Sequence, residues 1–192
     1  MNSGIELIDS SVAWKKLLVA LLISTVGGIG LWSTVVVMPT IELEFGLDRS
    51  DASIPYTATM IGFAIGGVIM GRFVDRYGIF FPVIISSFVL GLGYFLASLT
   101  MSFVQFSLVQ GILIGMFGCS VTLGPLIAYT SFWFRKRRGI AVSIVASGNY
   151  LAGTIWPPIL QFLIEELGWR SAHVCVGLIC IIIMIPLSFF LK

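Results

Sequence analysis

The charged residues of this chain that could hold a molecule or a part of the protein gather in two short segments. The first runs from Gly71 to Gly78 and holds Asp75 beside Arg76, with Arg72 one helical turn earlier. An aspartate in such a place can accept hydrogen bonds at a helix N-terminus or pair with nearby arginines. This segment is therefore suited to fastening helix ends.

The second segment is a run of four basic residues that precedes Gly139. It consists of Arg135, Lys136, Arg137 and Arg138. The net charge of the chain is only +2, and the basic residues flank apolar stretches. These charges favour contact with anionic lipid headgroups, and we expect no binding of nucleic acid.

The remaining reactive side chains do not form a catalytic set. Cys119, Cys175 and Cys180 have neither metal-binding nor disulfide spacing, so we interpret them as packing residues. The single histidine, His173, is expected to have a structural role near the end of its apolar stretch. Without a Ser/His/Asp set, a metal cluster or a phosphate loop, the sequence predicts no enzyme, no cofactor and no metal site.

A set of polar and aromatic residues lies inside the apolar stretches, where a polar group without a partner is costly. Its members are candidates to line a cavity for a solute: Trp32, Thr34, Tyr56, Thr59, Thr122, Tyr129, Asn149, Tyr150 and Trp156. Two alternatives stay open. The amide of Asn149 can instead join two helices by a hydrogen bond, and Trp32 and Trp156 can be anchors at the membrane surface.

The apolar stretches that carry these residues indicate a protein embedded in a lipid bilayer. Hydrophobic residues make up 58% of the chain and the mean hydropathy is +1.06. Charged residues make up 10%, against about 25% in soluble domains. A helix needs about 20 apolar residues to cross a bilayer. The charge-free stretch from Ile79 to Tyr129 is too long for one crossing, so we expect it to turn back between Ser98 and Ser102.

The sequence therefore predicts an all-α membrane protein, a bundle of six transmembrane helices. A tail at residues 1–16 comes first. The expected spans are 17–39, 54–70, 81–99, 104–129, 139–164 and 171–191.

The basic residues predict the orientation of this bundle. Nine of them fall on one side of the membrane: Lys15, Lys16, Arg72, Arg76, Arg135, Lys136, Arg137, Arg138 and Lys192. Only Arg49 and Arg170 fall on the other. We therefore expect the tail, both termini and the basic segments to be cytoplasmic, in a plasma or inner membrane.

Glycines within the spans recur at short intervals that allow helices to approach closely. Examples are Gly62 and Gly66 in the second span, Gly111 and Gly115 in the fourth, and Gly148 in the fifth.

The loop Gly71-x-x-x-Asp75-Arg76-x-Gly78 resembles the signature between spans two and three of the major facilitator superfamily. The segment from Trp133 to Ala141, followed by Gly148, is similar to the entry of span five in the monocarboxylate and oxalate/formate branch. Gly168-Trp169-Arg170 fits that branch too.

The chain also departs from the family pattern at two places. Ile79 and Phe80 stand where the loop signature usually ends in basic residues, and Ser107 stands where many proton antiporters of the superfamily have arginine.

The resemblance implies one half of a fold with about twelve spans, in which each half is a 3+3 inverted repeat and substrate binds between the halves. It implies an N-terminal half of a secondary transporter for small organic anions such as monocarboxylates. Its partner would be a C-terminal half. Two other hypotheses stay open: a half-size transporter that works as a parallel homodimer of two copies, and a membrane protein that binds partners without transporting.

Overall fold

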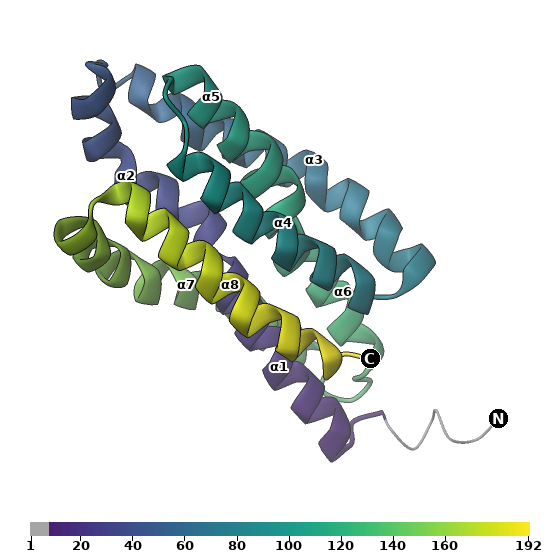
Figure 1. The fold of residues 1–192 in the computed structure, drawn as a ribbon. Helices are drawn as coiled ribbons and strands as arrows, with labels where there is room; N and C mark the ends of the chain where they lie inside the picture. The colour runs from purple at the N-terminus through teal and green to yellow at the C-terminus, as the bar shows by residue number, and fades with distance from the viewer. Residues whose placement is uncertain (1–7) are drawn as a thin grey trace.

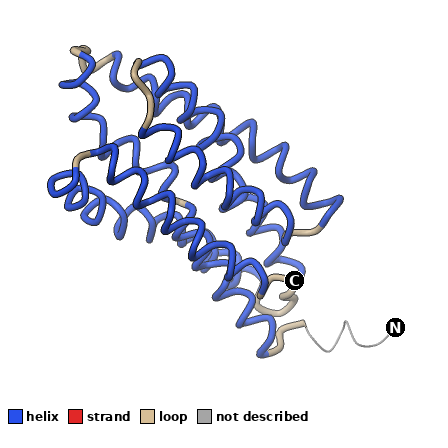
Figure 2. The backbone as a smooth tube through the Cα atoms, in the orientation of Figure 1, coloured by secondary structure: helices blue, strands red, loops and turns tan. Residues whose placement is uncertain are grey.

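The computed structural model describes residues 8–192, which form an all-helical bundle without any strand (Figure 1, Figure 2). Six helical stretches within these residues are long and apolar enough to cross a membrane. They are Ser11–Phe45, Asp51–Tyr77, Phe80–Ser98, Phe103–Phe132, Arg138–Leu167 and Trp169–Phe189. The predicted all-α fold with six spans is confirmed.

The helix ends differ from the expected limits where side chains cap the backbone. The first helix begins at Ser11, inside the expected tail, because the Ser10 hydroxyl accepts a hydrogen bond from the N–H of Ala13 at 3.4 Å. Residues 1–7 of that tail lie outside the described part of the chain. The turn between spans three and four lies at residues 99–102, and Ser102 caps the helix that follows.

The first span consists of two helices, α1 (Ser11–Gly27) and α2 (Ile29–Phe45). Gly28 joins them, and its N–H donates to the Ser24 carbonyl at 2.9 Å. A Cβ atom on Gly28 would lie 2.7 Å from the Cβ of Ala152 in the fifth span. Glycine at this joint therefore lets the fifth span pack directly on the break.

The second and third spans are regular helices, α3 (Ile54–Tyr77), after the short turn η1 (Asp51–Ser53), and α4 (Phe80–Ser98). Helix α3 ends at Gly78, whose φ of +76° lies in the left-handed region that favours glycine. The second glycine of the predicted loop segment is thus required by backbone geometry.

The fourth span changes its helical form three times. It runs through α5 (Phe103–Leu108), the π-helical segment η2 (Val109–Cys119), the 3₁₀ turn η3 (Ser120–Thr122) and α6 (Gly124–Phe132). Side-chain hydroxyls donate to carbonyls along this stretch: Ser86 to Phe117 O at 2.6 Å, and Thr122 to Cys119 O at 2.6 Å. These bonds satisfy carbonyls that a regular α-helix would pair internally.

The last two spans are α7 (Arg138–Leu167) and α8 (Trp169–Phe189), joined at Gly168, where φ is +77°. Helix α7 continues through Pro157 and Pro158. It packs against α1 and α2, while α8 packs against α4.

Glycines bring α3 and η2 into backbone contact. A Cβ atom on Gly62 would collide with the carbonyl oxygen of Gly111, and one on Gly66 with that of Met116. A Cβ atom on Gly67, the next residue along α3, would meet nothing within 4 Å. The close approach therefore depends on one face of α3.

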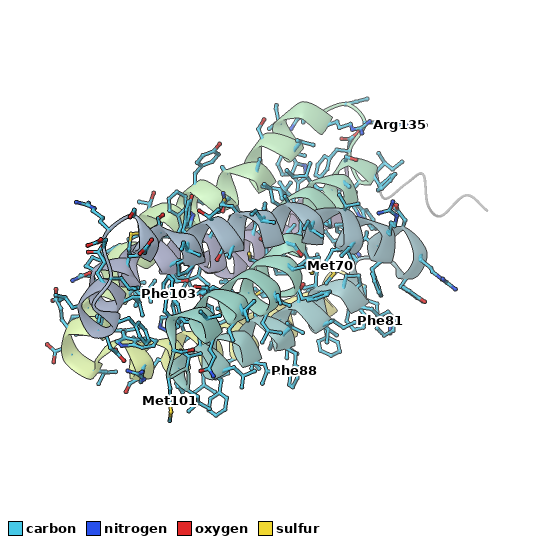
Figure 3. All side chains as sticks on the ribbon, turned by 90° about the horizontal axis from the view of Figure 1, so that it is seen from above. Met70, Phe81, Phe88, Met101, Phe103 and Arg135 are labelled. Atoms are coloured by element: carbon cyan, nitrogen blue, oxygen red, sulfur yellow. The ribbon has the colours of Figure 1, made fainter. Side chains whose placement is uncertain are left out.

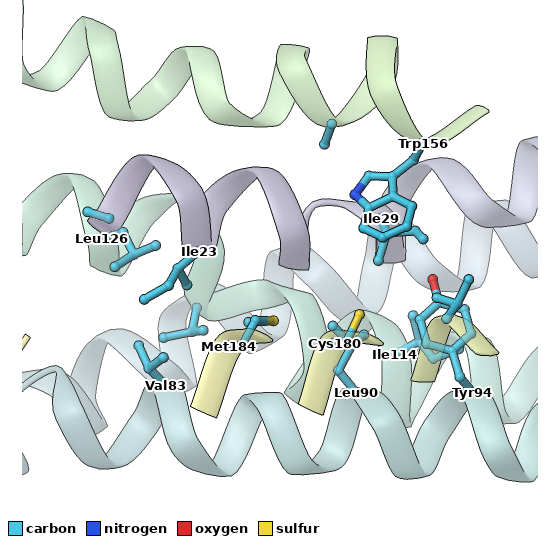
Figure 4. Close-up of a cluster of buried hydrophobic side chains, with 14 of the residues drawn as sticks. Ile23, Ile29, Val83, Leu90, Tyr94, Ile114, Leu126, Trp156, Cys180 and Met184 are labelled. Atoms are coloured by element: carbon cyan, nitrogen blue, oxygen red, sulfur yellow. The ribbon is translucent and has the colours of Figure 1, made fainter. Parts of the chain in front are cut away.

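The centre of the bundle is apolar and joins all six spans. Figure 4 shows part of this cluster, in which side chains from α1, α2, α4, η2, α6, α7 and α8 meet. The labelled residues include Ile23, Ile29, Leu90, Tyr94, Ile114, Leu126, Trp156 and Met184.

The start of α1 and the end of α8 lie at the same end of the bundle, which we call the terminal end (Figure 1). The Lys16 ammonium donates to the carbonyls of Leu191 at 3.2 Å and Lys192 at 2.6 Å. The opposite end is held by the ion pair of Glu44 and Arg170 at 2.5 Å.

The glycine contact of α3 leads to a first prediction. Gly66→Ala should lower the free energy of unfolding by about 1–3 kcal/mol, because the added methyl forces two backbones apart. Gly67→Ala is the matched control and should be neutral or stabilising by up to about 1 kcal/mol, since alanine favours the helix. Unfolding by SDS in mixed micelles measures both. Equal stability of the two variants would contradict the backbone contact.

Candidate functional site

The clearest grouping of predicted site residues lies where α7 meets the broken first span. The indole N–H of Trp32 donates to the carbonyl of Asn149 at 3.1 Å, and that of Trp156 donates to the carbonyl of Thr25 at 2.9 Å. A Cβ atom on Gly153 would lie 2.7 Å from the Trp32 ring. Both tryptophans lie in the middle parts of the first and fifth spans, away from the span ends where anchors at the membrane surface are found.

Asn149 and its neighbour Tyr150 lie on the outer side of this contact. The Asn149 side-chain oxygen lies beside the break, 3.3 Å from a Cβ atom placed on Gly28. Within the described residues, its amide makes no hydrogen bond to another helix. Tyr150 is 73% exposed. These two residues, with Trp32, are the predicted candidates that a solute beside α7 could reach.

The predicted threonines make hydrogen bonds within the bundle. Thr59 donates to Pro55 O at 2.8 Å within its own helix, as Thr122 does to Cys119 O. Thr34 donates to the side-chain oxygen of Gln110 at 3.3 Å, and both residues are buried. Sequence reasoning did not select Gln110, although its polarity inside an apolar stretch is the same signal that selected Asn149.

The two predicted tyrosines outside this group lie apart from each other. Tyr56 is half-buried near the start of α3. Tyr129 lies at the terminal end, where its hydroxyl donates to Leu191 O at 2.9 Å. The nine candidates therefore do not form one cavity wall.

The predicted loop segment, Gly71 to Gly78, forms the last turns of α3 and its cap, at the terminal end. Asp75 and Arg76 are both exposed. Asp75 lines a cavity of about 440 Å³, whose other residues include Gly78, Phe80 and Lys192. A Cβ atom on Gly71 would meet nothing within 4 Å. Among the described residues, no carboxylate of this segment forms an ion pair, so the segment is open to a further partner.

The basic run before α7 is fastened by an acid that the sequence did not single out. The Asp9 carboxylate accepts the backbone N–H groups of Lys136 at 3.1 Å and Arg135 at 3.3 Å. The N–H of Asp9 donates to Trp133 O at 3.0 Å. The Lys136 N–H is the main cause that lowers the pKa of Asp9 below its usual value. Arg138 donates to the Ser131 hydroxyl at 3.3 Å.

The side chains at the start of α7 face outward. Arg137 and Gly139 are exposed, and a Cβ atom on Gly139 would meet nothing within 4 Å.

The end of the bundle opposite the termini holds a second polar cluster. Glu44 at the end of α2 pairs with Arg170 and accepts the indole N–H of Trp169, both at the start of α8. Arg170 also donates to Thr100 O at 3.0 Å. One turn deeper, His173 is 1% exposed among the rings of Tyr94, Phe106 and Trp169. This cluster joins the ends of four spans, the first, third, fourth and sixth.

Comparison with known proteins supplies a family likeness. The sequence profile of the Major Facilitator Superfamily matches residues 20–192. The "MFS-type transporter 1" of Ophiocordyceps sp. (strain BCC 1869) is 35% identical over 125 residues, 64% of this chain and 28% of that protein. The "Agnestins efflux protein AgnL12" of Paecilomyces divaricatus is 34% identical over 152 residues, 74% of this chain and 35% of that protein.

A third relative matches this chain over a similar length. The "Aspyridones efflux protein apdF" of Emericella nidulans is 36% identical over 122 residues, 62% of this chain and 24% of that protein. The chain thus spans between about a quarter and about a third of the length of these three curated relatives.

The contact of Asp9 leads to a second prediction. Asp9→Asn should speed amide hydrogen exchange in the peptide around Arg135 and Lys136 several-fold, because a neutral amide accepts hydrogen bonds more weakly than a carboxylate. In the unchanged protein, this protection should persist above the ordinary aspartate pKa of about 3.9. It should be lost as the pH falls through the lowered pKa of the folded state.

Hydrogen exchange read by mass spectrometry measures both effects. Asp75→Asn is the control, since it removes the same charge at the same end of the bundle without touching this loop. Unchanged exchange in Asp9→Asn would show that the carboxylate does not hold the basic run.

Proposed function

The chain belongs to the Major Facilitator Superfamily, and we propose that its six spans form the N-terminal half of a secondary transporter. The transporter moves a small organic anion, such as a monocarboxylate, by alternating access. Relatives are named as efflux proteins for agnestins, fujikurins and aspyridones. We therefore propose that it carries its substrate out of the cell.

A polar stripe along α7 carries this proposal. Ser143, Ser147, Tyr150, Thr154 and Gln161 follow one another at intervals of 4, 3, 4 and 7 residues. Such intervals place them on one side of a helix. All are exposed except Ser147, which is half-buried. A helix side that faces lipid is apolar, whereas polar side chains inside a membrane face a water-filled path or another helix. The stripe therefore supports a solute path along α7.

The low burial of two spans supports a partner bundle that packs against them. Helices α3 and α7 are the least buried of the six spans, with 22% and 28% of their apolar windows buried. Large apolar residues are exposed on them, such as Ile61 and Val68 on α3 and Ile155 and Phe162 on α7. These surfaces fit a second six-helix bundle, which completes the path in the proposed transporter.

The charge distribution bears on the substrate. In the described spans, the charged side chains lie near helix ends, and the wall beside α7 is uncharged. An anion at mid-membrane needs a positive partner. In this proposal, that partner comes from the second bundle, while Trp32, Asn149 and Tyr150 contact the uncharged part of the substrate.

We propose that the terminal end faces the cytoplasm. The positive-inside rule favours that side for the basic residues at the loop segment, the basic run and the two termini. The plasma membrane is the proposed location, because export requires it.

Two alternatives remain to be tested beside this proposal. A parallel homodimer would supply the second bundle from another copy, since the two halves of the fold are related by an axis along the membrane normal. A membrane protein that binds partners without transporting would use the same exposed surfaces of α3 and α7.

The polar stripe leads to a third prediction. Single cysteines at Ser143, Tyr150 and Thr154 should react with a charged, membrane-impermeant thiol reagent, because thiolate forms only where water has access. Cys119, Cys175 and Cys180 are first replaced with serine or alanine.

Leu178→Cys and Ile182→Cys are the controls for this labelling. Both residues are exposed on α8, at 54% and 67%, but lie among apolar neighbours. They should react at least tenfold more slowly, because lipid excludes both the reagent and the thiolate. Equal reaction at the two sets would contradict a solute path along α7.

A fourth prediction separates the proposed half from the homodimer. The purified chain should give no saturable uptake of lactate, formate or oxalate in proteoliposomes, because alternating access requires two bundles. Uptake is measured at several protein-to-lipid ratios. Uptake that rises with the square of the protein density would establish the homodimer instead. Uptake in proportion to density would overturn the requirement for two bundles.

A further inference from the structure

A shallow apolar hollow lies at the corner where α3 ends and α4 begins. Its volume is about 340 Å³, and it is lined by Phe73, Tyr77, Phe81, Pro82 and Ile85. Phe81 is 58% exposed and Ile85 45% exposed. Figure 3 shows Phe81 on the outer side of the bundle, on the same side as Phe88 farther along α4. The hollow therefore opens outward, on the surface that meets the bilayer.

Two arginines on α3 are next in sequence to residues that line this hollow. Arg72 and Arg76 are one turn apart on α3 and share a helix side with each other, as Phe73 and Tyr77 do. Both are exposed, and the Arg76 guanidinium lies 5.4 Å from the centre of the Tyr77 ring. In the described residues, neither arginine forms an ion pair with a carboxylate.

The nearby acid does not neutralise this pair. Asp75 lies one helical turn from Arg72, but in the described residues it forms an ion pair with neither arginine, and it borders the separate 440 Å³ cavity beside Tyr129 and Lys192. The outer corner of α3 and α4 thus combines two exposed arginines with an apolar hollow. An occupant that matches it has an anionic group above and a hydrocarbon chain beneath.

We propose that this corner binds an anionic phospholipid from the leaflet at the terminal end. The acidic group of the headgroup pairs with Arg72 and Arg76, whose planar guanidinium groups suit carboxylate oxygens. One acyl chain lies in the hollow against Phe73, Phe81 and Ile85. The Tyr77 ring contacts the Arg76 guanidinium at the end of α3, and amphipathic aromatic residues of this kind gather at the membrane surface. This lipid site is independent of the proposed transport activity.

The test measures lipid binding to the purified chain by native mass spectrometry. Phosphatidylserine and phosphatidylcholine with the same acyl chains are titrated separately. Phosphatidylserine should bind more tightly by about thirtyfold, the attraction expected for two basic residues at an anionic surface. Arg72→Gln/Arg76→Gln should abolish this preference and leave the binding of phosphatidylcholine unchanged. That unchanged binding, with unchanged helix content by circular dichroism, shows that the variant is folded.

The matched control is Arg137→Gln/Arg138→Gln, which removes two charges from the same end of the bundle but away from the hollow. It should keep the preference within about twofold. Ile85→Trp should weaken binding of both lipids, because the indole ring is larger than the isoleucine side chain and fills the hollow. The single variants Arg72→Gln and Arg76→Gln each give a partial loss.

Three results would overturn the lipid site. The first is equal binding of the two lipids by the unchanged protein. The second is an equal loss in both double variants, which would indicate a general attraction to the basic end. The third is wild-type binding by Ile85→Trp, which would place the acyl chain elsewhere.

Discussion

Backbone groups inside hydrocarbon must find partners within the protein, and the irregular parts of this bundle depend on that requirement. The first span breaks at Gly28, and the indole of Trp156 in α7 donates to the Thr25 carbonyl just before the break. Carbonyls of the π-helical segment in the fourth span accept hydrogen bonds from Ser86 of α4 and from Thr122. Side chains that look available for a solute therefore complete the helices, and the spans can bend without leaving polar groups unpaired.

The sequence predicts the parts of the fold that depend on composition along the chain. Six spans, the turn near Ser98 and the close contact at Gly62 and Gly66 follow from hydropathy and from the spacing of small residues. The break at Gly28 and the π-helical segment do not, because they arise from packing against other spans. Asp9 was missed for a similar reason, since its partners lie more than 120 residues away.

In the candidate site too, some features follow from the sequence pattern and others arise only from packing. Trp32, Asn149 and Tyr150 are brought together because α7 packs on the first span, a pairing that hydropathy does not encode. Thr59 was selected for its polarity, but a threonine in a helix can bond its own backbone, and here it does. The stripe on α7 was present in the sequence as a spacing pattern, yet only the exposure of that helix side gives it a functional meaning.

The two ends of the bundle are fastened by different kinds of bond. The pair of Glu44 and Arg170 joins two full charges, whose side chains are 31% and 43% exposed. Mobile ions screen such a pair over about 8 Å at physiological salt. At the terminal end, Lys16 donates to neutral carbonyls and Asp9 accepts from neutral amides, so screening affects these bonds less. Salt therefore affects the two ends of the bundle differently. A high salt concentration weakens the contacts at the Glu44 end before those at the terminal end.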